Sequence, residues 1–321
     1  MTLKEIKSSE LNAADFIQGK TTEIKRAVGE GCAITALSGG VDSSVVTMLG
    51  YRALGPRLKV CFVDNGLMRE GEPENTALTF QKLGISVGIV SAQEFFFRAL
   101  HGISDPEEKR EAITQTFYKN VFARLVRESG AKCLLQGTIL TDIEETVAGV
   151  KRQHNVFEQL GIDPEKEFGY KIIEPLIQLR KDGVRIVAKK LGLPESIYNR
   201  MPFPGPALAA RVIGEVTSHE IKLIRMATAI TEEVLKDTKA FQCLAILHKD
   251  RVTGMKNGKR EFGRQIEIRC WDSIDARIAV PTKLSSSALD LLSSRITKEV
   301  PEVVSVTYNI TPKPPSTIEA I

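Results

Sequence analysis

The sequence has no long hydrophobic run. Its longest apolar stretches are only as long as a strand, so no segment is expected to span a membrane. The N-terminal segment MTLKEIKSSELNAADF has no apolar h-region of the kind found in signal peptides, and the expected location is the cytoplasm. There is also no long Lys/Arg block, and the net charge is only +4. This balance suits anionic small molecules such as nucleotides and does not by itself predict nucleic-acid binding.

Cysteine is scarce and scattered. There are five cysteines, none in a CxxC pair, so neither a disulfide framework nor a zinc site is expected. Cys32, Cys61 and Cys133 sit in apolar, strand-like runs and are expected to be buried, reduced thiols. The other two, Cys243 and Cys270, are the candidates for a reactive thiol outside the first half of the chain.

The sequence does contain enough apolar material for a large core. Of its 321 residues, 42% are hydrophobic and 26% charged, as in an ordinary globular protein of one large or two medium domains. In the first half, strand-sized runs alternate with helical patterns, beginning with a helix at about 13–29 for which Asn12 is a plausible N-cap. This alternation predicts a doubly wound parallel α/β sheet. The expected strands lie within 32–40, 59–66, 86–92 and 132–137.

The composition changes at MPFPGPALAAR (201–211), where prolines and Gly205 interrupt any regular element. We therefore expect two domains, 1–205 and 206–321. The second domain shows a long helix, an alternating strand, a second helix and a second strand, which together predict a small α+β unit. Such a unit is thin by itself, so we expect it to mediate homodimerisation. Its expected elements are 217–238, 264–271, 285–299 and 305–310.

The strongest local signal is SGGVDSS, Ser38 to Ser44, which follows a predicted strand and opens a predicted helix. Gly39 and Gly40 allow a tight turn and a close approach of the backbone to a ligand. Amide N–H groups then converge at a helix N-terminus, which favours anions, and the serines add hydroxyl donors. A carboxylate at Asp42 is compatible with phosphate when it holds Mg²⁺. The loop lacks the Gly-Lys-Ser/Thr ending of a Walker A motif.

SGGVDSS resembles the signature loop of the PP-loop, or N-type, ATP pyrophosphatases. Other segments, in the same order, resemble the ATP-pyrophosphatase part of the GMP synthetase family, and the similarity runs from about Asp15 to the end of the chain. The glutamine amidotransferase domain that is fused N-terminally in many relatives is not in this sequence. The matching segments are VDNGLMR (63–69), QGT followed by Asp142 and Glu145, KRQHNV (151–156), EPLIQLRKDGVR (174–185), MPFPGPALAAR (201–211) and KPPSTIE (313–319).

The resemblance implies a mechanism and a set of residues. ATP adenylates the O2 oxygen of the purine in XMP, pyrophosphate leaves with Mg²⁺, and ammonia displaces AMP; a separate amidotransferase subunit is a possible source of the ammonia. The implied catalytic residues are Asp42, Lys151, Lys181 and His154, with Asp42 also near the metal. The implied ATP-binding residues are Ser38, Gly39, Gly40, Val41, Asp42, Ser43, Ser44, Val63 and Gly137. The implied acceptor-binding residues are Arg69, Lys259, Lys313 and Glu319.

The acceptor half departs from the family pattern. The family's double histidine reads Gln153-His154 here. Lys259 stands where the family has an arginine, Gly183 replaces a carboxylate, and the tail ends in Ala-Ile where the family has Trp-Glu. These changes predict that XMP binds weakly compared with ATP. A drifted GMP synthetase subunit has such a pattern, and so does a paralogue with another acceptor, including sulfur transfer onto a nucleotide, tRNA or a small cofactor. A regulatory nucleotide-binding protein without catalysis is the third alternative, against which intact Asp42, Lys151 and Lys181 argue.

Overall fold

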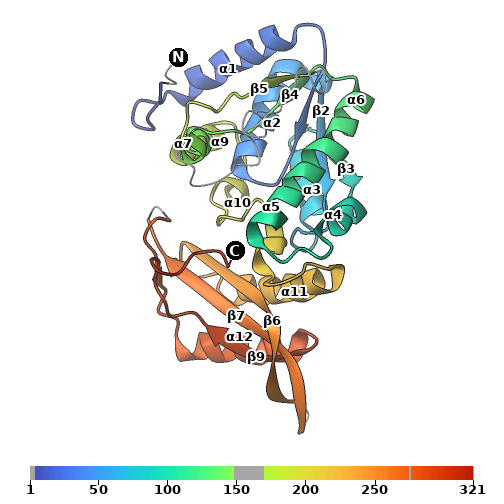
Figure 1. Ribbon diagram of the computed structural model, residues 1–321. Coiled ribbons are helices and arrows are strands. Elements are labelled where there is room, and N and C mark those ends of the chain that lie inside the picture. Colours follow the sequence, from blue (N-terminus) through green and yellow to red (C-terminus); the bar gives the residue numbers. More distant parts are fainter. Residues whose placement is uncertain (1–3, 148–169, 257, 275, 321) are drawn as a thin grey trace. The chain divides into compact units, whose positions relative to one another are not determined.

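The computed structural model of the protein describes residues 4–147, 170–256, 258–274 and 276–320 (Figure 1). Contacts within the chain define two compact units, each built from three segments. Unit 1 comprises Met1–Asp64, Glu72–Ser91 and Phe117–Arg200; unit 2 comprises Asn65–Gly71, Ala92–Thr116 and Met201–Ile321. The last segment of unit 2 begins close to the boundary expected at 205/206. The two shorter segments of unit 2 lie in the part of the sequence that we expected to form the first domain.

Unit 1 is built on a sheet of five parallel strands in the order β3-β2-β1-β4-β5. The strand order reverses between β1 and β4, as in the predicted doubly wound sheet, and such a switch point leaves a crevice at the carboxyl ends of the strands. Four of the five strands agree with the expected ranges to within one residue, and β5 is additional. The strands are β1 (Ala33–Ala36), β2 (Leu58–Asp64), β3 (Gly88–Ser91), β4 (Cys133–Leu135) and β5 (Lys171–Ile173).

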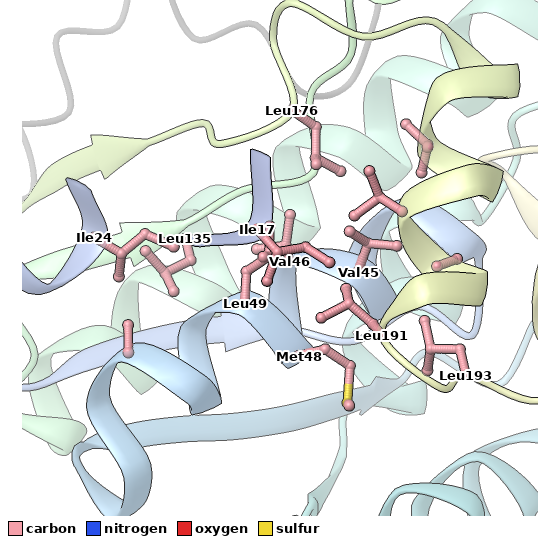
Figure 2. Close-up of a cluster of buried hydrophobic side chains, with 14 of the residues drawn as sticks. Ile17, Ile24, Val45, Val46, Met48, Leu49, Leu135, Leu176, Leu191 and Leu193 are labelled. Carbon is pink, nitrogen blue, oxygen red and sulfur yellow. The ribbon is translucent and has the colours of Figure 1, made fainter. Parts of the chain in front are cut away.

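Helices cover both faces of this sheet. On one face, α1, α2 and α9 form a large apolar cluster with alternate strand residues such as Ala33 and Leu135 (Figure 2). On the other face, Ile34 and Leu134 pack against α6 and the π-helical turn before it. The expected cap is confirmed, because the Asn12 side chain accepts hydrogen bonds from the first amides of α1. The elements named here are α1 (Ala13–Val28), α2 (Val41–Leu54), the π-helical turn (Thr116–Phe122), α6 (Ala123–Ser129) and α9 (Lys181–Lys190).

Further helices complete unit 1. After α2, a 3-10 turn (Gly55–Arg57) leads into β2. The others are α3 (Glu72–Lys82), α7 (Leu140–Val147) and α10 (Glu195–Tyr198). None of the helices in the described ranges has the length and apolar character needed to cross a membrane.

Unit 2 is an α+β unit, as predicted. Its central strand β7 pairs antiparallel with β6 and β8 and parallel with β9. Helices α11 and α12 pack against the sheet and against each other. The sheet consists of β6 (Gln242–Lys256), β7 (Lys259–Asp272), β8 (Val280–Pro281) and β9 (Val303–Tyr308). The helices of this unit include α4 (Gln93–Leu100), α5 (Pro106–Gln115), a 3-10 turn (Ala207–Arg211), α11 (Ser218–Val234) and α12 (Ser286–Glu299).

The hairpin of β6 and β7 corrects one expectation about the cysteines. Cys243 and Cys270 are cross-strand partners with Cα atoms 4.1 Å apart, and they are joined as a disulfide. We expected no disulfide, which was wrong because β6 was not recognised in the sequence and its pairing brings these two positions together. Cys61 and Cys133 are buried, as expected, while Cys32 is half-buried. Burial raises the pKa of the Cys61 thiol to about 12.

Candidate active site

The segment Ser38–Ser44 follows β1 at the switch point of the unit 1 sheet and includes the first turn of α2. Gly39 has a φ of +77°, which a side chain would strain, and Gly40 is the N-cap of α2 in extended conformation. Gly137, just after β4, lies against the start of α2, because a Cβ added there would be 3.1 Å from the Ser43 nitrogen. Three predicted glycines thus allow the loop and the next strand end to approach closely.

The loop presents donors at a helix N-terminus. Ser43 Oγ lies 2.9 Å from Ser38 Oγ and 3.1 Å from the Gly40 carbonyl oxygen, so the hydroxyls brace the turn. Ser44 Oγ donates to the same carbonyl at 2.8 Å. In the described part of the chain, the amides of Val41, Asp42 and Ser43 have no hydrogen-bond acceptor. Those three amides and the partial positive charge of the helix end form a site for an anion.

Asp42, in the first turn of α2, faces Lys181 at the start of α9. The Lys181 Nζ atom lies 2.5 Å from Asp42 Oδ2, and both side chains are partly exposed. The other oxygen, Asp42 Oδ1, is buried and has no hydrogen-bond partner among the described residues. A buried carboxylate oxygen without a partner among the described residues, beside a site for an anion, is suited to hold a divalent cation. The described residues contain no cluster of three acidic, His or Cys side chains that would hold a metal alone.

Three polar side chains form an outer wall behind the loop, and the sequence did not reveal them. Arg200 donates from Nη1 to the Gly39 carbonyl oxygen at 3.1 Å, and its Nη2 lies 2.6 Å from the Glu72 carboxylate. A Cβ added to Gly39 would lie 3.0–3.3 Å from polar atoms of Glu72, Arg200 and Thr76. Glu72 and Arg200 fall beside the motifs VDNGLMR and MPFPGPALAAR, but no local spacing links them to the phosphate loop.

The remaining expected residues of the ATP half lie as follows. Val63 is buried near the carboxyl end of β2, at the same edge of the sheet as the loop. Lys151 and His154 lie outside the described residues. The structure thus brings together the phosphate loop, Gly137 and Lys181.

Unit 2 contains a second cluster, around Phe203. The guanidinium carbon of Arg69 lies 3.8 Å from the centroid of the Phe203 ring, and that of Arg211 lies 4.9 Å from it. Both distances are within the range of cation–π contact. Arg69 Nε also pairs with Glu232 of α11 at 2.6 Å.

Arg211 is almost fully buried and joins this cluster to the C-terminal tail. Its Nε and Nη2 atoms each lie 3.3 Å from a carboxylate oxygen of Glu319. Gln242, at the start of β6, donates to Glu319 Oε1 at 2.7 Å. Arg211 Nη1 is buried and finds no acceptor in the described ranges. A buried, charged donor without an acceptor is unfavourable by itself, and an anionic ligand would satisfy it.

A second arginine fixes the tail itself. Arg269 of β7 donates from Nη1 to the backbone carbonyls of Thr317 and Glu319, at 2.8 and 3.2 Å. Its Nε lies 2.6 Å from Glu267 Oε1. Burial would raise the pKa of Glu267, but hydrogen bonds from His248, Arg269 and Asn309 outweigh it and lower the pKa to about 2. Glu267 is therefore a fixed negative charge that orients Arg269, and Arg269 orients the tail that carries Glu319.

The other two expected acceptor residues, Lys313 and Lys259, have different surroundings. Lys313 donates from Nζ to the Ala276 carbonyl at 2.7 Å, and its backbone pairs with Ala279. Lys259 is exposed at the turn end of the hairpin. It is ten residues from Arg269 along β7, or about 33 Å at about 3.3 Å per residue. The structure therefore unites Arg69 and Glu319 through Phe203 and Arg211, and it does not bring Lys259 to them.

The SGGVDSS loop joins β1 to α2 in a five-stranded parallel sheet and forms a site for an anion, which is the arrangement of a PP-loop ATP pyrophosphatase. Comparison with known proteins agrees: residues 228–320 match the family described as GMP synthase C terminal domain. The chain is 46% identical to a subunit of the glutamine-hydrolyzing GMP synthase of Archaeoglobus fulgidus over 309 residues, covering 96% of this chain and 99% of the relative. The corresponding protein from Methanocaldococcus jannaschii is 43% identical over 309 residues, covering 95% and 97%.

The chain therefore belongs to the family of these GMP synthase subunits. A further member, from Pyrococcus furiosus, is 46% identical over 307 residues, with 95% of this chain and 96% of the relative covered. The resemblance found in the sequence is confirmed, and so is the class of enzyme, a ligase of the ATP-pyrophosphatase type. The match extends through both units, so the acceptor half belongs to the family despite its substitutions.

Proposed function

We propose that this protein is the ATP-pyrophosphatase subunit of a two-subunit GMP synthase. It adenylates the O2 oxygen of XMP with ATP, releases pyrophosphate, and lets ammonia displace AMP to give GMP. The observation that carries this proposal is the loop of three free amides beside a carboxylate oxygen without a partner in the described ranges, at the switch point of the sheet. The near full-length similarity to subunits of GMP synthase supports the choice of reaction.

In the proposed mechanism, the loop holds the leaving group. The amides of Val41, Asp42 and Ser43 bind the β- and γ-phosphate oxygens, where negative charge grows as the bond to the α-phosphate breaks. The hydroxyl bridge between Ser38 and Ser43 keeps the turn in shape. Val63 and Gly137 line the place proposed for the adenine, at the carboxyl ends of β2 and β4.

Asp42 and Lys181 complete the charge balance. Asp42 Oδ1 would hold Mg²⁺, which when bound neutralises the charge of the phosphates. Lys181 Nζ, now paired with Asp42, is positioned to donate to a phosphate oxygen at the same place. Lys151 and His154 are proposed to act near the transferred group, as the family resemblance implies.

The acceptor site is proposed at the Phe203 cluster in unit 2. Arg211 Nη1, a buried donor with no acceptor in the described ranges, fits an anionic group of XMP. Arg69 stacks over Phe203 and offers a second cation, while Glu319 accepts hydrogen bonds. Lys313 stays a proposed acceptor residue, because its ammonium group donates to the Ala276 carbonyl and has two further N–H groups.

The alternative function, sulfur transfer, is no longer favoured, because the cysteines that suggested it are not available as thiols. It would need a reactive thiol, and the two candidates, Cys243 and Cys270, are buried and joined to each other. The thiolate form is the nucleophile, and burial opposes its formation at Cys61 as well.

The ammonia source is proposed to be a separate glutamine amidotransferase subunit, with both proteins in the cytoplasm. This follows from the relatives, which are named as glutamine-hydrolyzing enzymes and as single subunits of them. The test is pyrophosphate release from ATP and Mg²⁺ with the purified chain. We expect release that requires XMP, and GMP formation with ammonium ions but not with glutamine. Glutamine should become a nitrogen source only after the amidotransferase is added. XMP-independent release, or no release with any purine nucleotide, would contradict the proposal.

We also propose that the protein is a homodimer formed through residues after Pro206. Of the large hydrophobic side chains that the structure describes as exposed, most lie in this part of unit 2, and exposed apolar side chains are the ones that an interface would bury. They are Met255, Phe262, Ile274, Ile278, Val280, Leu291 and Ile310.

Light scattering at micromolar concentration should therefore give the mass of a dimer, about twice 35.4 kDa. Ile278→Glu places a charge on the proposed interface and should raise the dimer dissociation constant by about tenfold or more. Ile186→Glu, which alters an exposed isoleucine of unit 1, is the matched control and should leave the dimer intact. A monomeric wild-type protein would refute this proposal.

A further inference from the structure

The wall behind the phosphate loop, formed by Glu72, Thr76 and Arg200, has a role that could not be inferred from the sequence of the loop. Arg200 and Glu72 form an ion pair at 2.6 Å, and Glu72 is only 6% exposed. Glu72 lies in the first turn of α3, where the helix dipole favours a carboxylate. The negative charge is therefore held in one place, and it fixes the guanidinium group beside the loop.

The Arg200 guanidinium group also forms a hydrogen bond with one peptide group of the loop. Its Nη1 donates to the Gly39 carbonyl oxygen at 3.1 Å, while the N–H of that same peptide, on Gly40, donates to Ser38 Oγ at 3.4 Å. In a trans peptide the carbonyl and the N–H point to opposite sides. Arg200 thus holds the oxygen on the wall side, and Ser38 receives the N–H on the side of the loop hydroxyls.

This peptide needs an external restraint, because it joins two glycines. Neither Gly39 nor Gly40 has a side chain that would bias its backbone angles, so the peptide can rotate at little cost. After rotation, the carbonyl oxygen would point to the loop side, where three free amides form the anion site. An oxygen at that place repels phosphate, so the orientation of this one peptide decides whether the loop is complementary to its ligand.

We propose that Arg200, anchored by Glu72, is a positioning residue that fixes the Gly39–Gly40 peptide in the orientation that admits a pyrophosphate group. Arg200 acts through the backbone and not as a ligand of phosphate, because its charge is already balanced by Glu72. The inference rests on the proposed role of Ser38–Ser44 in binding the β- and γ-phosphates, and it adds to that role the element that sets the geometry of the loop.

The test measures binding of inorganic pyrophosphate, and of a non-hydrolysable ATP analogue with Mg²⁺, by calorimetry on folded variants of the full chain. Arg200→Lys keeps the charge but loses the fork that bridges a carbonyl and a carboxylate, and should weaken both ligands about tenfold. Glu72→Gln removes the anchor and should also weaken them. The double variant Arg200→Met with Glu72→Gln, which leaves no unpaired buried charge, should be weakened about a hundredfold.

Two controls make the outcome specific. Arg57→Met removes another arginine of unit 1 that donates to backbone carbonyls, those of Gly29 and Gly31 at 2.5 and 2.8 Å, and should leave both affinities unchanged. Gly39→Ala disturbs the loop directly and should abolish binding. If Gly39→Ala has no effect, the proposed phosphate site itself is wrong.

If Gly39→Ala abolishes binding but Arg200→Lys binds as the wild type does, the loop is the site and the positioning role of Arg200 is refuted. Tighter pyrophosphate binding by Glu72→Gln would also refute it, because a released guanidinium would then be a direct phosphate ligand. A lower melting temperature with unchanged affinities would show that the ion pair only stabilises the fold, which is equally a refutation.

Discussion

Replacing Asp42 by alanine should abolish pyrophosphate release while leaving the protein folded. Asp42 Oδ1 is the buried oxygen at the phosphate loop that has no partner among the described residues, and it is the proposed Mg²⁺ ligand. Without this ligand, Mg²⁺ would no longer be held where it neutralises the charge of the phosphates. This removes several kcal/mol of transition-state stabilisation, and we expect turnover to fall about a thousandfold. The fold should tolerate the change, since an acidic residue in the first turn of a helix contributes only about 0.3–1 kcal/mol.

Two further variants distinguish loss of the proposed Mg²⁺ ligand from loss of the ion pair between Asp42 and Lys181. Asp42→Asn keeps the size of the side chain and should be nearly as inactive, with turnover that rises when Mg²⁺ is raised. Lys181→Gln removes the partner that lies 2.5 Å from Asp42 and should lower turnover without altering the dependence on Mg²⁺. Turnover is measured as pyrophosphate release under saturating ATP and XMP, and folding by thermal unfolding. Near-normal release by Asp42→Ala would refute the assignment of this residue.

The ATP half of this site was predictable from sequence for a physical reason. The loop, its two glycines and Asp42 are consecutive, and the chain direction places them at the end of a recognisable strand. Gly137 was predictable because it follows another strand of the same parallel sheet, so its end lies at the same edge. Arg200 was not, because it reaches the Gly39 carbonyl from a position 161 residues away and from no regular element.

In the fold, too, some elements could be predicted from the sequence and others could not. Buried strands such as β1 and β2 are short apolar runs with turns after them, and the sequence revealed them. The strand β6 mixes buried residues with the exposed, polar arm of a hairpin and was missed. That omission also hid the pairing of Cys243 with Cys270 and the position of Gln242 against Glu319. We assigned Lys259 to the acceptor site because of its place in a family motif. The structure places it at the turn end of a long hairpin, and the length of that hairpin, which the sequence did not reveal, separates Lys259 from the tail.

Replacing Arg211 should produce the largest loss of acceptor binding. The sequence predicted weak XMP binding, because Lys259 stands where the family has a guanidinium fork. In the structure, a guanidinium fork is nevertheless present against the tail. Arg211 is 1% exposed, contacts Glu319 with two nitrogens, and has a third, Nη1, with no acceptor in the described ranges. If that third nitrogen binds XMP, the Lys259 substitution is not expected to weaken the acceptor site of its own chain.

Arg211→Lys keeps the buried positive charge that balances the Glu319 carboxylate, so the fold should be preserved. The lysine lacks the planar fork, so it cannot form hydrogen bonds with Glu319 and with a ligand at the same time. The lost charge-assisted hydrogen bond contributes about 1.5–3 kcal/mol, so XMP affinity should fall about tenfold to a hundredfold. Affinity for the ATP analogue, measured in the same calorimetric series, should not change. Lys259→Met is the matched control and should bind XMP as the wild type does. Normal XMP binding by Arg211→Lys, together with weak binding by Lys259→Met, would place the acceptor at the hairpin turn and refute the Phe203 cluster as its site.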